Sequence, residues 1–130
     1  MKFTIKSLFH KEQDVKEIVK QWILSIDKEQ SMPEGIVALN FGLFEPYGIE
    51  LTGAKCYDDK NDDWACEEDY VPEHRTCSDL NIPANKGWED VLNDMVALLK
   101  ELIRELPDLQ LWQVEHITTG FSEGDLIRVK

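Results

Sequence analysis

Residues 88–106 read WEDVLNDMVALLKELIREL and are the most strongly patterned stretch of the chain. Their apolar side chains recur every three or four positions, which is the spacing of one face of an α-helix. Asn85 is a suitable N-cap, and Pro107 ends the pattern because proline cannot continue a helix. This stretch therefore predicts a long amphipathic helix whose apolar face is wide enough to pack under a sheet.

A shorter helix and a pair of strands precede this stretch. Residues 15–26 have apolar side chains at helical spacing, and Asp14, three positions before Glu17, is predicted to cap that helix. Residues 36–44 form an apolar run with β-branched and aromatic side chains, while residues 49–52 alternate between apolar and polar. The sequence Glu-Pro-Tyr-Gly between them is typical of a turn, so we expect an antiparallel hairpin.

The remaining elements complete an α+β fold. Residues 109–121 and 126–130 have strand patterns around a turn, and Gly53 is predicted to carry a β-bulge. Residues 2–6 suit either a short strand or the lead-in to the first helix. The economical architecture is a mainly antiparallel sheet of four to five strands, with two amphipathic helices packed on one face. A long acidic loop lies between the second or third strand and the second helix. We expect a single domain over residues 1–130.

Acidic side chains dominate the composition. The 130 residues include 26 acidic and 14 basic side chains, which gives a net charge of −12. This charge repels phosphate groups, so binding to nucleic acid or to an anionic membrane surface is not expected. A basic protein or a cation is the natural electrostatic complement. The 42% hydrophobic content is enough for a packed core without disulfides or metals.

The cysteines and the N-terminal sequence indicate where the protein works. Residues 1–6 are followed by charged residues rather than by the apolar run of a signal peptide, and no stretch is apolar enough to span a bilayer. Cys56, Cys66 and Cys77 are an odd number of thiols, which does not suit a disulfide framework. We therefore expect reduced cysteines and a cytoplasmic location.

Residues 56–79 form the most distinctive segment of the chain. They hold nine acidic and two basic side chains, a net charge of −7 out of the total of −12. A long loop inside a compact domain usually carries function or lacks order. We expect a short strand at residues 64–70 and a surface that binds a basic partner. The predicted partner-binding residues are Asp58, Asp59, Asp62, Asp63, Trp64, Glu67, Glu68, Asp69 and Tyr70.

Two alternatives are open for the aromatic residues of this segment. Trp64 and Tyr70 can serve as exposed anchors of a protein interface, with the surrounding carboxylates steering a partner. Alternatively, both side chains tuck into the core and hold a long loop in place. Trp22, Trp88 and Trp112 lie on regular elements and are predicted to be core residues.

A metal- or thiol-dependent site is an alternative function, and its residues would be Cys56, Cys66, His74 and Cys77. Their spacing lacks one of the two close ligand pairs that are typical of structural zinc sites. Residues 59–63 match the start of a calcium-binding loop, but Trp64 stands where that loop needs glycine. Nearby carboxylates would raise the pKa of a thiol, which opposes thiolate formation. We therefore predict no metal and no cofactor.

The sequence shows no constellation typical of an enzyme. His10, His74 and His116 lie in separate regions, and there is neither a nucleophile motif nor a glycine-rich phosphate loop. We expect a non-catalytic protein. A further alternative is an accessory or structural domain whose partner uses the edge strand at residues 126–130. The identity of the partner and the oligomeric state are open.

Two runs resemble small bacterial proteins, namely WACEEDY at residues 64–70 and GFSEGDLIR at residues 120–128. With its size, its charge and its α+β plan, the chain resembles the small acidic immunity proteins that bacteria make against polymorphic or contact-dependent toxins. This resemblance implies a non-catalytic inhibitor that binds a basic toxin domain, often a nuclease. An acidic surface would then mimic the phosphate groups that such a toxin binds.

Overall fold

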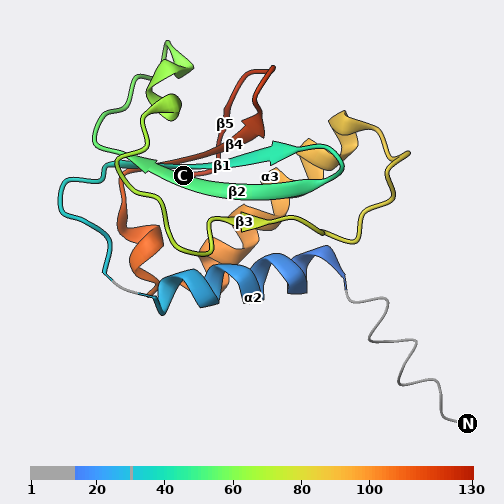
Figure 1. The fold of residues 1–130 in the computed structure, drawn as a ribbon, viewed down its shortest axis with the longest axis horizontal. Coiled ribbons are helices and arrows are strands. Elements are labelled where there is room, and N and C mark those ends of the chain that lie inside the picture. The colour runs from blue at the N-terminus through green and yellow to red at the C-terminus, as the bar shows by residue number, and fades with distance from the viewer. Residues whose placement is uncertain (1–13, 30) are drawn as a thin grey trace, which may run out of the picture.

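A computed structural model of the protein describes residues 14–29 and 31–130 (Figure 1). Two helices are present in this part of the chain, α2 (Val15–Asp27) and α3 (Trp88–Glu105), as the apolar spacing predicts. The predicted strand at residues 2–6 lies outside the described residues. None of the described helices is long and apolar enough to cross a bilayer.

The caps of the two helices differ. The N-cap of α2 is Asp14, whose carboxylate accepts a hydrogen bond from the backbone N–H of Glu17 at 2.8 Å, so this prediction is confirmed. The N-cap of α3 is Gly87, which has no side chain to accept such a bond, so the prediction of Asn85 as the cap is wrong. Asn85 lies two residues before this cap, because the turn before α3 continues through Lys86.

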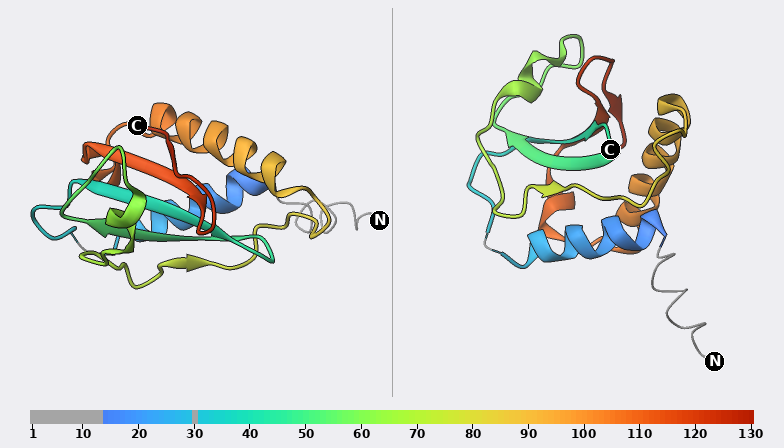
Figure 2. Two further views of the ribbon diagram at one scale, coloured as in Figure 1. Left: turned by 90° about the horizontal axis from the view of Figure 1, so that it is seen from above. Right: turned by 45° about the vertical axis from the view of Figure 1, so that its right-hand side comes forward.

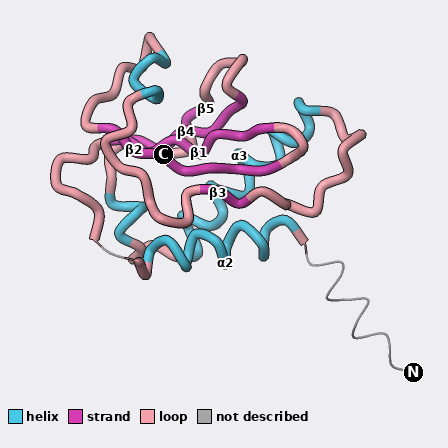
Figure 3. The backbone as a smooth tube through the Cα atoms, in the orientation of Figure 1, coloured by secondary structure: helices cyan, strands magenta, loops and turns pink. Residues whose placement is uncertain are grey.

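In the described part of the chain, the sheet has five strands in the order β3-β2-β1-β4-β5 (Figure 3). Three of its four strand pairings are antiparallel, while β1 and β4 run parallel, and this confirms the mainly antiparallel α+β fold. The long strands occupy the middle, and each outer strand has two residues. The strands are β1 (Ala38–Phe44), β2 (Gly48–Ala54), β3 (Thr76–Cys77), β4 (His116–Phe121) and β5 (Ile127–Arg128).

The hairpin of β1 and β2 is confirmed, but the predicted bulge at Gly53 is wrong. The pairing runs without interruption from Ala38 opposite Ala54 to Phe44 opposite Gly48. Gly53 is needed for another reason, because a Cβ atom there would lie 3.1 Å from the Cβ of Tyr70. Tyr70 forms a two-way backbone bridge with Gly53, so the glycine allows the acidic segment to approach β2 closely.

Two predicted strands have a different structure. Residues 109–121 are not one strand, because Gln110–Gln113 form a 3₁₀ helix, η2, before β4 begins. Leu111 and Trp112 are consecutive and both buried, which a strand covered on only one face cannot achieve. Residues 64–70 are not a strand either. A second 3₁₀ helix, η1 (Asp62–Cys66), takes their place and begins at Asn61, whose side chain accepts a hydrogen bond from the Asp63 N–H.

Both helices pack on one face of the sheet and form the main core with it (Figure 2). Phe41 of β1 is fully buried at its centre, with its ring 6.0 Å from the rings of both Trp22 and Trp112. These two tryptophans are core residues, as predicted. Trp88 is not, because 51% of it is exposed. It is the first residue of α3, and helical periodicity does not show how far along a helix the sheet extends.

Candidate functional site

The first part of the acidic segment forms a lobe on the face of the sheet that the helices leave open. We call residues 56–69 the acidic lobe; they carry seven acidic side chains and one basic side chain. In Figure 2 the lobe rises from the sheet on the side opposite α2, next to the loop between β4 and β5. The backbone N–H of Lys55 donates to Asp69 Oδ2 at 2.8 Å, which closes the lobe at its base.

Trp64 holds the acidic lobe on the sheet. It is 6% exposed and packs with Ala38 and Ala54 in a small apolar cluster on the open face. The Tyr57 ring lies 5.1 Å from the Trp64 ring and stacks on the His116 ring at 3.8 Å, with an angle of 9° between the planes. The buried Trp64 side chain therefore anchors the lobe to the sheet. This is the alternative in which the aromatic side chain is buried and holds the loop in place, rather than exposed in a protein interface.

Tyr70 is also buried, but in a different place. The chain passes around the edge of β2 after the lobe, and Tyr70, at 6% exposed, belongs to the main core. Burial, followed by the charges of Glu29 and Asp27, raises the pKa of Tyr70 to about 12. The structure therefore does not bring Trp64 and Tyr70 together on one exposed surface.

The raised pKa of Tyr70 predicts a loss of stability at alkaline pH that the Tyr70→Phe variant will not show. An unfolded tyrosine has a pKa of about 10, so above that pH the unfolded state loses a proton that the folded state keeps. The contribution is complete below pH about 10 and is lost as the pH rises toward about 12, where the folded state also ionises. By pH 11 the wild type should lose about 1 kcal/mol relative to the variant. Urea unfolding of both proteins at pH 9 and pH 11 measures this, and an equal loss in the two would contradict it.

The seven carboxylates of the acidic lobe are all exposed. Some of them hold the backbone of the lobe: Asp58 accepts from the N–H of Lys60 at 2.9 Å, as Asp69 does from Lys55. The carboxylates of three others make no hydrogen bond or ion pair with any residue in the described part of the chain. These three are Asp59, Asp63 and Glu67. They are free to meet a partner without loss of an internal contact.

A hollow of about 390 Å³ lies between the acidic lobe and the loop that joins β4 to β5. We call it the open-face hollow, since its floor is the polar face of β1, β2 and β4. The two walls are joined by a hydrogen bond from the backbone N–H of Leu126 to Asp62 Oδ2 at 3.1 Å. The polar and charged side chains that define it include Asn40, Glu50, Thr52, Asp62, Glu68 and Arg75.

Arg75 lies between two carboxylates in this hollow. Its Nη2 atom is 2.8 Å from Glu50 Oε1 and 3.2 Å from Glu68 Oε2. Hydrogen bonds to Glu68 and Glu50 raise the pKa of the guanidinium further, so Arg75 stays charged. The three carboxylates that line the hollow thus outnumber its one cation, and the hollow favours a positively charged group.

The sequence predictions include part of this site and miss the rest. Asp62 and Glu68 line the open-face hollow, while Asp58, Asp59, Asp63, Glu67 and Asp69 lie on the exposed lobe. Glu50 and Arg75 were not among the predicted residues. The alternation of residues 49–52 already places Glu50 on the face away from Leu51, so its direction was available in the sequence, although the hollow it faces was not.

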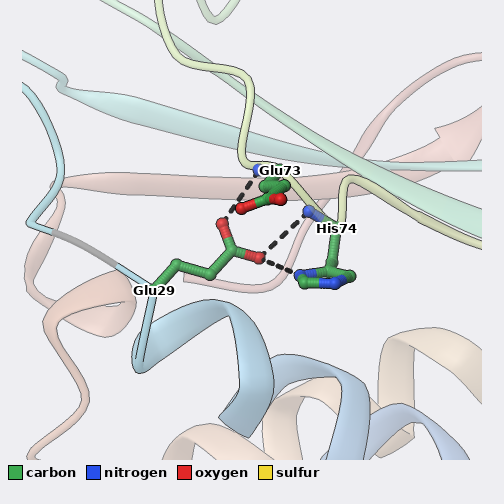
Figure 4. Close-up of side chains that lie close together, drawn as sticks. All are labelled: Glu29, Glu73 and His74. Carbon is green, nitrogen blue, oxygen red and sulfur yellow. Dashed lines mark hydrogen bonds and ion pairs between the residues drawn. The ribbon is translucent and has the colours of Figure 1, made fainter.

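Figure 4 shows a second cluster of titratable groups, Glu29, Glu73 and His74, on the helix side of the sheet. The Glu29 carboxylate accepts from the backbone N–H groups of Glu73 and His74 at 2.8 and 3.0 Å and lies 2.6 Å from His74 Nδ1. Although desolvation opposes it, the hydrogen bonds from His74 and from these N–H groups keep the pKa of Glu29 below its usual value. With Glu29 fully occupied in this way, the cluster is a clamp between α2 and the acidic segment.

The proposed ligands of an alternative metal site do not converge. Cys66 lines the open-face hollow, Cys77 packs against the main core, and His74 is bound to Glu29. Cys56 is exposed on the lobe, and all three cysteines are free thiols. Burial raises the pKa of the Cys77 thiol. A hydrogen bond with the backbone of Asp79 lowers this pKa in part, and the negative charge of Asp79 raises it. Within residues 14–29 and 31–130, Glu29, Glu73 and His74 are the one group whose ligand atoms lie close enough together to hold a metal ion. The aspartates of residues 59–63 do not converge in this way.

Comparison with known proteins adds no relative to this description. No family model matches the chain, and neither a curated protein nor a solved structure is significantly similar to it. The fold and the site therefore define the protein as an α+β protein with an acidic lobe on the open face of its sheet.

Proposed function

We propose that this protein is a non-catalytic binding module for a basic protein partner, which it holds with the acidic lobe and the open-face hollow. The observation that carries the proposal is the position of the lobe. Seven exposed carboxylates lie on a segment that Trp64 fixes to the sheet, beside a hollow with a further carboxylate, Glu50. A fixed surface of one charge attracts a partner of the opposite charge and sets its orientation.

The specific role that we propose is an immunity protein that neutralises a basic toxin domain in the cytoplasm. The resemblance of the sequence to such proteins is one support for this role. A second is the chemistry of the lobe, because a row of carboxylates resembles the phosphates that a nuclease binds. The three free thiols suit a reducing compartment.

Reversing two charges of the acidic lobe should weaken binding of the partner at least about tenfold. The variant is Asp63→Lys with Glu67→Lys, because neither carboxylate forms a hydrogen bond or ion pair with the residues that the structure describes. By contrast, Asp62 accepts from the Leu126 N–H and Glu68 pairs with Arg75. A pull-down from native lysate, read by mass spectrometry, compares this variant with the wild type.

The matched control is Glu34→Lys with Asp108→Lys, which changes the net charge equally at two exposed acids outside the lobe. We expect a basic protein to be recovered with the wild type and the control and to be depleted with the lobe variant. Equal depletion of the basic protein with both variants would show that only the overall net charge matters for binding. If no specific partner is recovered with any of the three proteins, the proposed function is wrong.

A further inference from the structure

Trp88 is the most exposed large apolar side chain in the described part of the chain, and it does not stand alone. It is 51% exposed at the start of α3, and its ring meets the Phe121 ring at a centroid distance of 6.2 Å and an angle of 83°. Phe121 in turn meets Tyr47 at 6.2 Å and 64°. These edge-to-face contacts fix the Trp88 ring from one side and leave the other side to solvent.

A hollow of about 280 Å³ lies next to this exposed ring. We call it the aromatic hollow; it is lined by Glu45, Trp88, Phe121, Glu123 and Gly124, and thus by two rings, two carboxylates and no basic side chain. Glu45 and Glu123 are exposed, and neither carboxylate is bound to another side chain of the described residues. An aromatic face beside unpaired carboxylates is the environment that binds an organic cation.

The helix N-terminus beside the hollow acts against a cation, but the charges around it outweigh this effect. The free N–H groups at the start of α3 are equivalent to about half a positive charge. Glu89 and Asp90 lie in the first turn of α3 and offset it. The carboxylates of Glu45 and Glu123 are then not offset, and the net charge of the hollow is negative.

We propose that the aromatic hollow binds one arginine side chain of the basic partner, with the guanidinium over the Trp88 ring and its N–H groups donating to Glu45 and Glu123. Arginine fits better than lysine because its planar guanidinium both stacks on a ring and donates in several directions. The volume lies just below the range of about 300–1,000 Å³ that is usual for small-molecule sites, and it suits a single side chain.

This inference rests on the proposed function, since it names one contact of the same partner. Phe121 and Gly124 line both the aromatic hollow and the open-face hollow, so the two hollows adjoin at the loop between β4 and β5. A partner that carries several basic residues can place one of them in each hollow. The aromatic contact would give the binding a direction that a purely acidic surface lacks.

The test uses a single arginine in place of the unidentified partner. Nα-acetylarginine N-methylamide is titrated into the ¹⁵N-labelled protein at low ionic strength, and the indole N–H signal of Trp88 and the amide signal of Gly124 are followed by NMR. We expect a saturable shift at both positions. The citrulline analogue, which has the same shape without the charge, should give no saturable shift. No response at Trp88, or an equal response to both compounds, would overturn the proposal.

Three variants locate the effect. Glu45→Gln with Glu123→Gln should weaken the binding about fivefold, as should Trp88→Leu when the Gly124 amide is followed. Val71→Ala should have no effect, although Val71 is also exposed, at 41%. If the arginine compound binds equally well to the Glu45→Gln with Glu123→Gln variant and to the Trp88→Leu variant as to the wild type, the arginine site is wrong.

The two proposals fail separately. The lobe variant Asp63→Lys with Glu67→Lys should keep the response at Trp88, because its substitutions lie outside the aromatic hollow. A saturable response at Trp88 combined with an unsuccessful pull-down contradicts the proposed function and supports the arginine site. A successful pull-down without a response at Trp88 supports the proposed function and contradicts the arginine site.

Discussion

Replacing Trp64 with alanine should release the acidic lobe from the sheet and lower the free energy of unfolding by about 3 kcal/mol. Trp64 is 6% exposed, and the cluster around it is small, with Ala38 and Ala54 as its other buried members. Removal of the indole leaves these alanines with too little apolar surface to keep the lobe in place. Because the main core lies on the other face of the sheet, the rest of the fold should persist.

Urea unfolding measures the loss of stability, and brief digestion with a protease that cleaves at aspartate reports on the lobe. The wild type should resist cleavage at residues 58–63, and the Trp64→Ala variant should be cut there first. The variant should also lose affinity for the partner, since a released lobe must be ordered again on binding. Cleavage spread evenly over the chain would contradict a local effect.

Replacing Phe41 with alanine should cost more, about 4 kcal/mol, and its effect should be global. Phe41 is fully buried on the helix side of the same sheet, between Trp22 of α2 and Trp112 of η2. The cavity left by its ring would separate both of these elements from β1. Since a domain of this size is stable by about 5–15 kcal/mol, the variant should be close to the limit of folding.

Phe41 and Trp64 thus form a matched pair of buried aromatic residues on opposite faces of one sheet. In the Phe41→Ala variant, the urea midpoint should fall strongly, and protease cleavage should increase along the whole chain. If Phe41→Ala were to affect only the lobe, or were to cost less than Trp64→Ala, the assignment of the main core to the helix side would be wrong.

The helices and the first hairpin could be predicted from the sequence because each is determined by neighbouring residues. The apolar spacing of residues 88–106 and the turn between residues 44 and 49 are local signals. The parallel pairing of β1 with β4 is not local, since it joins residues as distant as Asn40 and Thr118. A strand pattern shows which side chains share a face but does not show which strand lies alongside.

The acidic segment could be located from composition, while its division between two faces could not. Charge density identifies residues 56–79, but the burial of Trp64 on the open face and of Tyr70 in the main core depends on how the chain passes around β2. The exposure of Trp88 was missed for a similar reason. Its place in the helical pattern is regular, and only the three-dimensional structure shows that it lies beyond the packed part of α3.

The shortness of the outer strands has a consequence for self-association. Long, flat outer strands present rows of unpaired backbone groups that recruit other chains into amyloid-like aggregates. Here β1, β2 and β4 are enclosed, and the borders of the sheet are the two-residue strands β3 and β5. Arg128 on β5 adds a charge that discourages stacking of apolar strands. The described part of the sheet therefore offers no long row of unpaired backbone groups as a template for fibril growth.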